Sequence, residues 1–324
     1  MDDFEKTNKL EGIFIPYMRE RRDLLYDSGK NLHSRFVHYT TAEAAIKIIR
    51  QKKLWLRNTT CMADYGEVHH GFKILQKFFQ NKENGALFRN TVNGFAEGAS
   101  DTALNLFDKI WKNAQFNIHI GCVSEHRDDE NINGRLSMWR AFGSSTAARV
   151  AIVFKLPWRG KTLPNFNLRF CPVAYMKQLD SDQLLHKVIE KMKENMKFLA
   201  TIPKNEITNW IYAMVFCGAS CLKHDGFEEE REWRVVYCPP IDGGNQFFDM
   251  SVEIINGIPQ RIYHLPLDGK ISTSSEFTEI FDQIIIEPTV YRSAIGEAFA
   301  TALSEVGVLE PEKKIFVSDI TIRT

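Results

Sequence analysis

Three short stretches of the 324-residue chain place polar and aromatic side chains between apolar strands, where such side chains can meet a ligand. The first stretch is 36–40, in which His38 and Thr40 lie at a predicted strand-to-helix junction. Both can direct hydrogen-bonding groups into the same space. The structural alternative is that Thr40 caps the following helix and that His38 bonds to a nearby carbonyl. The pattern alone favours this alternative.

The second stretch is 124–143, which contains Trp139, Arg140 and Phe142 on a predicted short helix. Two aromatic residues three apart on a helix more often fill a core than stack on a ligand. The planar guanidinium of Arg140 can also pair with a phosphate. The sequence therefore leaves open whether this stretch packs or binds.

The third stretch is 226–236, where a charged run enters an apolar strand. Side chains alternate along a strand, so Glu230, Glu232 and Arg234 are expected to share one face. A charge run is usually a solvated face or a protected sheet edge. Two carboxylates beside a cleft can also stabilise the cationic transition states of glycosyl transfer.

Composition favours a globular protein. The chain carries 41 Lys and Arg against 41 Asp and Glu, and 44% of its residues are hydrophobic. This balance argues against a protein that coats nucleic acid, because that affinity comes from clustered basic residues. The first residues lack a signal-peptide pattern, and no apolar run approaches the roughly 18 residues that span a membrane. We therefore expect a cytoplasmic protein with no membrane contact.

The six cysteines are scattered, and no two of them form a Cys-x-x-Cys pair. Zinc sites and redox motifs generally need such paired spacing. We therefore expect no metal site, and we interpret the cysteines as small core residues.

Apolar periodicity predicts strands and helices in irregular alternation, without the Gly-rich turn of a dinucleotide-binding Rossmann unit. The fold class predicted is α+β, with a mainly antiparallel sheet and helical insertions. The predicted strands are 36–40, 54–56, 116–124, 148–156, 168–176, 233–238, 260–265 and 283–287, and the predicted helices include 44–49, 66–80, 135–142, 184–196 and 294–306.

In this order, the stretches resemble a bacterial family of unknown function, the domain-of-unknown-function 2971 family (DUF2971). The resemblance covers about 33–320 and implies one domain over 1–324, with a helical insertion at about 178–222. The chain departs from the family pattern at Ala63, Gly66 and Arg140. The segments that carry the resemblance are His38-Tyr39-Thr40, Leu54-Trp55-Leu56, Asp64-x-x-Glu67, Ser124, Met138-Trp139-x-x-Phe142-Gly143, Glu230-x-Glu232-Trp233-Arg234 and Ile284-Ile285-Ile286.

The opening strand and the late glutamate strand are in turn similar to those of the His-Tyr-Glu class of ADP-ribosyltransferases. That resemblance implies a split-sheet, ADP-ribosyltransferase-like fold that binds NAD as its substrate. It implies that His38 bonds to ribose with help from Thr40, and that Tyr39 or Phe142 stacks on nicotinamide.

The same resemblance makes Glu232 or Glu230 the catalytic carboxylate, which stabilises the cation formed as nicotinamide leaves. Further candidates for contact with the nucleotide are Trp139, Arg140 and Arg234.

The function expected on this basis is transfer of ADP-ribose from NAD to a protein or nucleic acid acceptor. The setting that the resemblance implies is a bacterial toxin or an anti-phage defence effector, with a partner protein from a toxin–antitoxin or defence system. The alternative is a catalytically inactive module that senses a nucleotide or a phage protein. The departures at Ala63 and Arg140 motivate this alternative.

Overall fold

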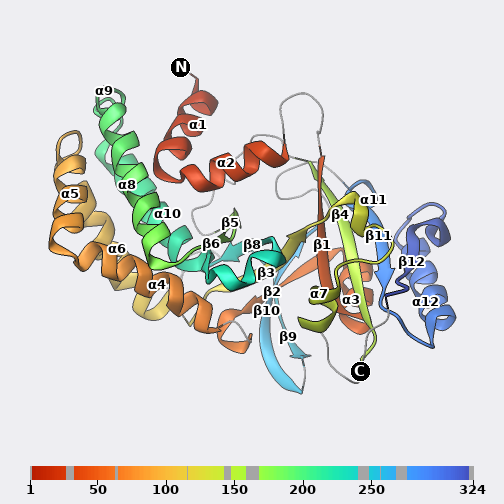
Figure 1. The fold of residues 1–324 in the computed structure, drawn as a ribbon. Coiled ribbons are helices and arrows are strands. Elements are labelled where there is room, and N and C mark those ends of the chain that lie inside the picture. The colour runs from red at the N-terminus through yellow and green to blue at the C-terminus, as the bar shows by residue number, and fades with distance from the viewer. Residues whose placement is uncertain are drawn as a thin grey trace.

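The computed structural model describes residues 2–26, 33–62, 65–114, 116–141, 147–157, 168–239, 248–255, 257–267 and 276–320. Figure 1 shows a group of helices on the left, a sheet through the middle and a smaller group of helices on the right. The helices are α1 (Asp3–Phe14), α2 (Pro16–Leu25), α3 (Ala42–Gln51), α4 (Tyr65–Gln80), α5 (Lys82–Asn93), α6 (Ala99–Ala114), α7 (Leu136–Ala141), α8 (Gln178–Glu194), α9 (Met196–Leu199), α10 (Lys204–Cys221), α11 (Phe277–Ile280) and α12 (Arg292–Glu305).

Most strands of the described chain join one open sheet in the order β12-β11-β4-β1-β3-β2-β10-β9, and β8 and β5 extend it from β3. Pairing is antiparallel except between β11 and β12, and β6 and β7 form a separate short parallel pair. These findings confirm the predicted α+β class with a mainly antiparallel sheet. The strands are β1 (His33–Thr41), β2 (Lys53–Asn58), β3 (His119–Glu125), β4 (Arg149–Pro157), β5 (Leu168–Pro172), β6 (Ala174–Tyr175), β7 (Leu222–Lys223), β8 (Glu232–Tyr237), β9 (Met250–Ile255), β10 (Ile258–Pro266), β11 (Phe281–Ile286) and β12 (Ile315–Val317).

The sheet divides at β3, because β1 and β2 both pair with the same edge of this strand. β8 occupies the other edge from His119 to Ser124. β1 pairs with the C-terminal end of β3 through Phe36 and Val37, and β2 pairs with its N-terminal end through Arg57 and Asn58. Beyond these contacts β1 pairs only with β4, and β2 pairs only with β10, among the described strands. We call the opening between residues 38–41 of β1 and 53–56 of β2 the fork.

The helix α3 connects the two arms of the fork. The hydroxyl of Thr41 accepts a hydrogen bond of 3.3 Å from the backbone N–H of Ala44, so Thr41, rather than Thr40, caps the helix. Ala45, Ile48 and Ile49 are buried against the apolar residues of β4 and β11. A single amphipathic helix therefore fixes both arms.

Helix α12 packs beside α3, and most of the other long helices cover the other part of the sheet. α4, α6, α8 and α10 share one apolar core with Ile120 of β3 and Val236 of β8. Helices α8, α9 and α10 fall within the predicted insertion at 178–222, and whether they are an insertion stays a prediction. In the part of the chain that the structure describes, no helix is both long and apolar enough to cross a membrane.

A glycine at position 121 permits the close approach of β2 to β3. A Cβ atom at Gly121 would lie 2.8 Å from Cδ2 of Leu56 and 3.2 Å from Cδ2 of Leu54. Any larger residue must displace these side chains, which belong to the arm of the fork that β2 forms.

We predict that Gly121→Ala lowers the free energy of unfolding by about 1–3 kcal/mol, because the added methyl group overpacks this contact. Gly12→Ala is the matched control, since a Cβ at Gly12 in α1 meets nothing within 4 Å. In a helix that change is expected to stabilise the protein by about 0.5–1 kcal/mol. Urea denaturation of both variants measures the difference, and equal midpoints would contradict the prediction.

Candidate functional site

His38 lies where β1 leaves β3, and its ring is oriented by the main chain of β3. Its Nδ1 is 2.8 Å from the carbonyl oxygen of Cys122. A carbonyl only accepts, so Nδ1 carries the proton and Nε2 of the neutral ring is an acceptor. This contact is the structural alternative that the sequence favoured, and it also leaves Nε2 as an acceptor for a ligand.

The charge state of His38 follows from its surroundings. Burial lowers the pKa of His38, the hydrogen bond to Cys122 partly opposes this, and the nearby positive charge of Arg57 lowers the pKa further. The imidazole is therefore neutral at neutral pH. A neutral ring with Nε2 unprotonated can accept a hydrogen bond from a hydroxyl group such as that of ribose.

Arg57 contributes a guanidinium to the same region. Both its Nε and one terminal nitrogen lie 3.2 Å from Oε1 of Gln260 on β10, and that terminal nitrogen also donates to the carbonyl oxygen of Cys61 at 3.1 Å. Thr40 follows His38 on the same face of β1, because side chains alternate along a strand. The fork, with Arg57 at the first residue beyond it, thus combines an acceptor nitrogen, a hydroxyl group and a fixed positive charge.

Glu232 lies on β8, directly opposite Ser124 of β3, and is fully engaged by cations. Arg234 donates to both carboxylate oxygens, at 2.8 and 3.0 Å, and Nζ of Lys223 is 3.6 Å away. Glu230 binds the same lysine at 2.6 Å. The two carboxylates therefore do lie together, as the alternation along 230–234 predicted, and Lys223 links them.

The backbone reaches this arrangement by a route that the sequence pattern did not predict. Glu230 ends the 3₁₀ helix Asp225–Glu230 rather than belonging to β8. Between the two carboxylates, Arg231 adopts the left-handed conformation with a φ of 46°. Strand alternation thus relates Glu232 to Arg234 only, and the turn at Arg231 returns Glu230 to the same lysine.

The cations set the ionisation of Glu232. Burial alone would raise the pKa of Glu232, but the charge and hydrogen bonds of Arg234, the charge of Lys223 and a hydrogen bond from the Cys122 thiol lower it overall. Glu232 is therefore an ionised carboxylate at neutral pH rather than a base poised near it.

Cys122 connects the two halves of the predicted site. Its carbonyl oxygen accepts the hydrogen bond from His38, and its thiol bonds to the carboxylate of Glu232. Sequence reasoning placed His38 and Glu232 in one site without identifying this link. No local signal indicates it, because Cys122 is one residue of an ordinary alternating strand.

Tyr39 and Trp139 lie on the opposite face of β1 from His38 and pack against each other. Their ring centroids are 4.9 Å apart in an edge-to-face arrangement. The Tyr39 hydroxyl accepts a hydrogen bond of 2.9 Å from the backbone N–H of Arg135, and Nε1 of Trp139 donates to the carbonyl of Asn133 at 2.8 Å. Both rings are buried, so their use as ligand contacts stays a prediction.

Another predicted contact, Arg140, is exposed near the end of α7. Phe142, the alternative stacking residue, lies outside the residues that the structure describes, as does Asp64 of the family pattern.

Sequence reasoning missed a second buried cluster beside the site. Glu130 accepts hydrogen bonds from Arg135, at 3.1 Å, and from Arg231. Glu125 receives two hydrogen bonds from Arg21 of α2 and one from Nε1 of Trp233. These contacts attach α2, α7 and the start of β8 to one another. Only the density of charged residues at 125–135 hints at the cluster in the sequence.

Comparison with known families gives a match to a segment that contains part of the candidate site. Residues 138–235, from α7 to β8, match the family described as protein of unknown function (DUF2971). Over these residues the match supports the family predicted from the ordered motifs. It spans Trp139 and Arg140 on α7 and both carboxylates, whereas His38 and Cys122 lie outside it. Neither the curated proteins nor the solved structures include a match to this chain.

We predict that Glu232→Gln lowers the free energy of unfolding by about 3–5 kcal/mol at neutral pH. The substitution leaves Arg234 and Lys223 buried without the anion that they share. The pKa of Glu232 is lower in the folded chain than its ordinary 4.5. The contribution of the carboxylate is therefore complete above about pH 4.5 and is lost as the pH falls through the lower folded value.

Denaturation of the wild type and the variant between pH 7 and pH 3 measures this difference, which should shrink below pH 4.5. The control is Glu228→Gln, which removes an exposed carboxylate of the 3₁₀ helix Asp225–Glu230. It should change the free energy of unfolding by less than about 0.5 kcal/mol. A difference for Glu232→Gln that is small or independent of pH would contradict the assigned ion pairs.

Proposed function

We propose that the chain is an ADP-ribosyltransferase-like enzyme that cleaves NAD and transfers ADP-ribose to a protein or nucleic acid acceptor. The observation that carries the proposal is the juxtaposition at Cys122. His38 bonds to its carbonyl oxygen at the fork, and Glu232 bonds to its thiol. An unprotonated ring nitrogen and an ionised carboxylate thus belong to two side chains that both contact one residue of β3.

Each group has a role that its chemistry supports. Nε2 of His38 accepts a hydrogen bond from a ribose hydroxyl, and Thr40 assists on the same face. Arg57 supplies positive charge for the diphosphate, since guanidinium groups pair well with phosphate oxygens. This assignment needs no protonation of His38, whose lowered pKa keeps it neutral.

The carboxylate acts electrostatically. As the bond between nicotinamide and ribose breaks, its electron pair leaves with nicotinamide and positive charge develops on the sugar. A fixed anion near that charge lowers the barrier by a few kcal/mol. Glu232 is ionised and held in place by Arg234. Glu230 also binds Lys223, so this lysine neutralises the charge of Glu232 only in part. Either glutamate supplies the anion, and variants distinguish them.

A binding module is the second candidate, and one observation favours it. The Arg234 guanidinium already binds both carboxylate oxygens of Glu232. A carboxylate so engaged is less available to a substrate. In this case the fork binds a nucleotide or a phage protein and catalyses no reaction. Adding NAD then raises the melting temperature, but no nicotinamide is released.

The biological setting extends the proposal by family resemblance alone. We propose a cytoplasmic toxin or anti-phage defence effector that acts with a partner protein of the same system. Once the reaction is identified, the acceptor and the partner protein can be sought.

The test is incubation of the purified chain with NAD and cell lysate, with free nicotinamide measured by chromatography. We expect release by the wild type, and a loss of about 10²-fold or more in His38→Ala and in the variant of the catalytic glutamate. Glu230→Gln and Glu232→Gln are compared at a temperature at which circular dichroism shows each to be folded. Glu228→Gln, which removes an exposed neighbouring carboxylate, is the matched control and should retain release.

Retained release in both folded glutamate variants would refute the catalytic assignment. Absence of release from the folded wild type, combined with a rise in melting temperature on adding NAD, would establish the binding module instead.

A further inference from the structure

The strand β9 lies at one end of the sheet and pairs with β10 alone among the described strands. Figure 1 shows the two strands as a curved hairpin that extends toward the bottom of the view. Three apolar side chains of β9 are exposed, with exposed fractions of 45% for Met250, 68% for Val252 and 70% for Ile254. They share one face, since side chains alternate along a strand. We call these three residues the edge row.

The backbone of the edge row points to the open side of β9. The N–H of His264 on β10 donates to the carbonyl oxygen of Asp249 at 3.0 Å, so these residues form a hydrogen-bonded pair. Such pairs recur at every second residue of an antiparallel ladder. Ser251, Glu253 and Ile255 therefore direct their N–H and C=O groups at β10. The N–H and C=O groups of the edge row face away from β10, at the edge of the sheet.

This edge lacks the residues that usually keep a sheet edge from pairing with another strand. Natural edge strands are commonly blocked by lysine or proline. β9 contains neither, and its single charged residue, Glu253, alternates onto the other face from the edge row. There Nζ of Lys47 lies 3.3 Å from the Glu253 carboxylate and offsets its charge. The edge of β9 is therefore suited to the addition of a further strand.

The sequence of β9 matches itself when two copies run antiparallel. A two-fold axis at Val252, perpendicular to the sheet, places Val252 opposite Val252 of a second copy and Met250 opposite Ile254. All of these residues belong to the edge row, so their backbones exchange about six hydrogen bonds, two for each pair. The same register places Ser251 opposite Glu253, where the hydroxyl can donate to the carboxylate. The apolar rows of the two copies then become continuous.

Shifted registers lose these contacts. An axis at Glu253 brings the Glu253 carboxylates of the two copies face to face, and like charges directly opposite each other are destabilising. An axis at Ser251 places Ile254 opposite Phe248, which lies beyond the end of β9. Only the axis at Val252 joins both complete edge rows without opposing like charges. This self-complementarity is what a symmetric interface between identical chains requires.

We propose that two copies of the chain associate through β9, antiparallel about a two-fold axis at Val252, so that their sheets become continuous. Few residues take part, so the dimer is in equilibrium with the monomer rather than permanent, as is usual for small interfaces. The proposal does not rest on NAD chemistry, since no residue of β9 belongs to the candidate site. Its test stands whether or not nicotinamide is released.

The first test is sedimentation velocity of the full chain between about 1 and 100 μM, the range in which weak complexes dissociate. We expect the sedimentation coefficient to rise with concentration from that of a monomer toward that of a dimer. Val252→Lys places two like charges at the axis and should keep the chain monomeric throughout. Val290→Lys is the matched control, because it changes an apolar residue that is 88% exposed outside β9, and it should still dimerise.

Cysteine variants test the register. Diamide should link two copies of Val252→Cys through a disulfide, because the two thiols meet at the axis, and the diamide is reduced as it takes up both thiol protons. Ile254→Cys should give at least tenfold less covalent dimer. In the proposed register its counterpart lies four residues, or about 13 Å, further along the partner strand. Combining Met250→Cys with Ile254→Cys should restore the link, and the native cysteines are common to every variant.

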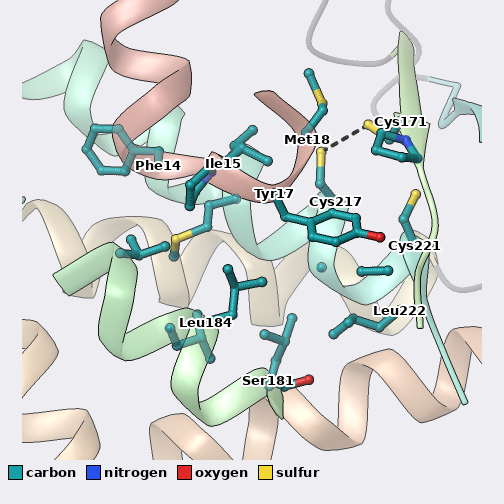
Figure 2. Close-up of a pocket in the computed structure, with 18 residues that line it drawn as sticks. Phe14, Ile15, Tyr17, Met18, Cys171, Ser181, Leu184, Cys217, Cys221 and Leu222 are labelled. Atoms are coloured by element: carbon teal, nitrogen blue, oxygen red, sulfur yellow. Dashed lines mark hydrogen bonds between the residues drawn. The ribbon is translucent and has the colours of Figure 1, made fainter. Parts of the chain in front are cut away.

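Methionine methyl signals locate the interface in the wild type. The test uses the full chain with ¹³C-labelled methionine methyl groups. We expect the signal of Met250 to shift as the concentration rises. Met18 and Met214 line an apolar pocket between α2 and α10, and their signals should not shift. Figure 2 shows Met18 among the residues around this pocket.

The wild-type measurements decide the proposal even if a variant folds poorly. A wild type that stays monomeric over the whole range would overturn it. A dimer that Val252→Lys leaves intact, equal cross-linking of Val252→Cys and Ile254→Cys, or shifts that spread equally to Met18 and Met214 would do the same.

Discussion

The sharing of one edge of β3 by two strands is the constraint on which the rest of the structure depends. β8 covers the other edge completely, so β1 and β2 divide what is left and must separate. Gly121, Cys122 and Val123 then pair in register with β8 alone among the described strands. A polar main chain at such a position needs partners. The ring of His38 supplies one of them at Cys122, so the contact that satisfies the divided sheet also fixes the orientation of this ring.

The buried charges connect this sheet to the helical layer. Lys223 follows α10 almost directly, and Arg234 donates to the carbonyl of Ser220 within that helix. Glu230 and Glu232 neutralise the two cations, so the four side chains carry no net charge. Burying ions costs solvation, and such groups often specify one arrangement rather than add stability. Here they determine how the end of α10 meets β8.

Local patterns in the sequence predicted much of the fold. Apolar patterns predicted the strands that became β3, β4 and β8, and the Thr-rich junction before Ala44 predicted the start of α3. α10 lies within the helical insertion predicted at about 178–222, but its bounds were not predicted, because it is buried on most of its surface and lacks a polar face with a helical period. β9 was not predicted, and its apolar residues lie on an exposed edge rather than in a core.

The sequence analysis named candidate site residues but did not predict the contacts between them. His38 and Glu232 are 194 positions apart in the sequence, and only the pairing of β3 with β1 and β8 brings them to Cys122. The burial of Lys223 could not be predicted from the sequence either, because a lone lysine after an apolar helix usually lies in solvent. Pairings between distant strands carry no short-range signal, and the identity of each ion pair follows from them.

The left-handed backbone at Arg231 has a consequence for how this loop can change. Glycine is the residue that such a conformation favours, and it would relieve the main chain at once. It would also withdraw the guanidinium that reaches Glu130 across the start of β8. Backbone strain and ion pairing thus favour different residues at this one position. A glycine that relieves the strain of the turn would also remove its ion pair with Glu130.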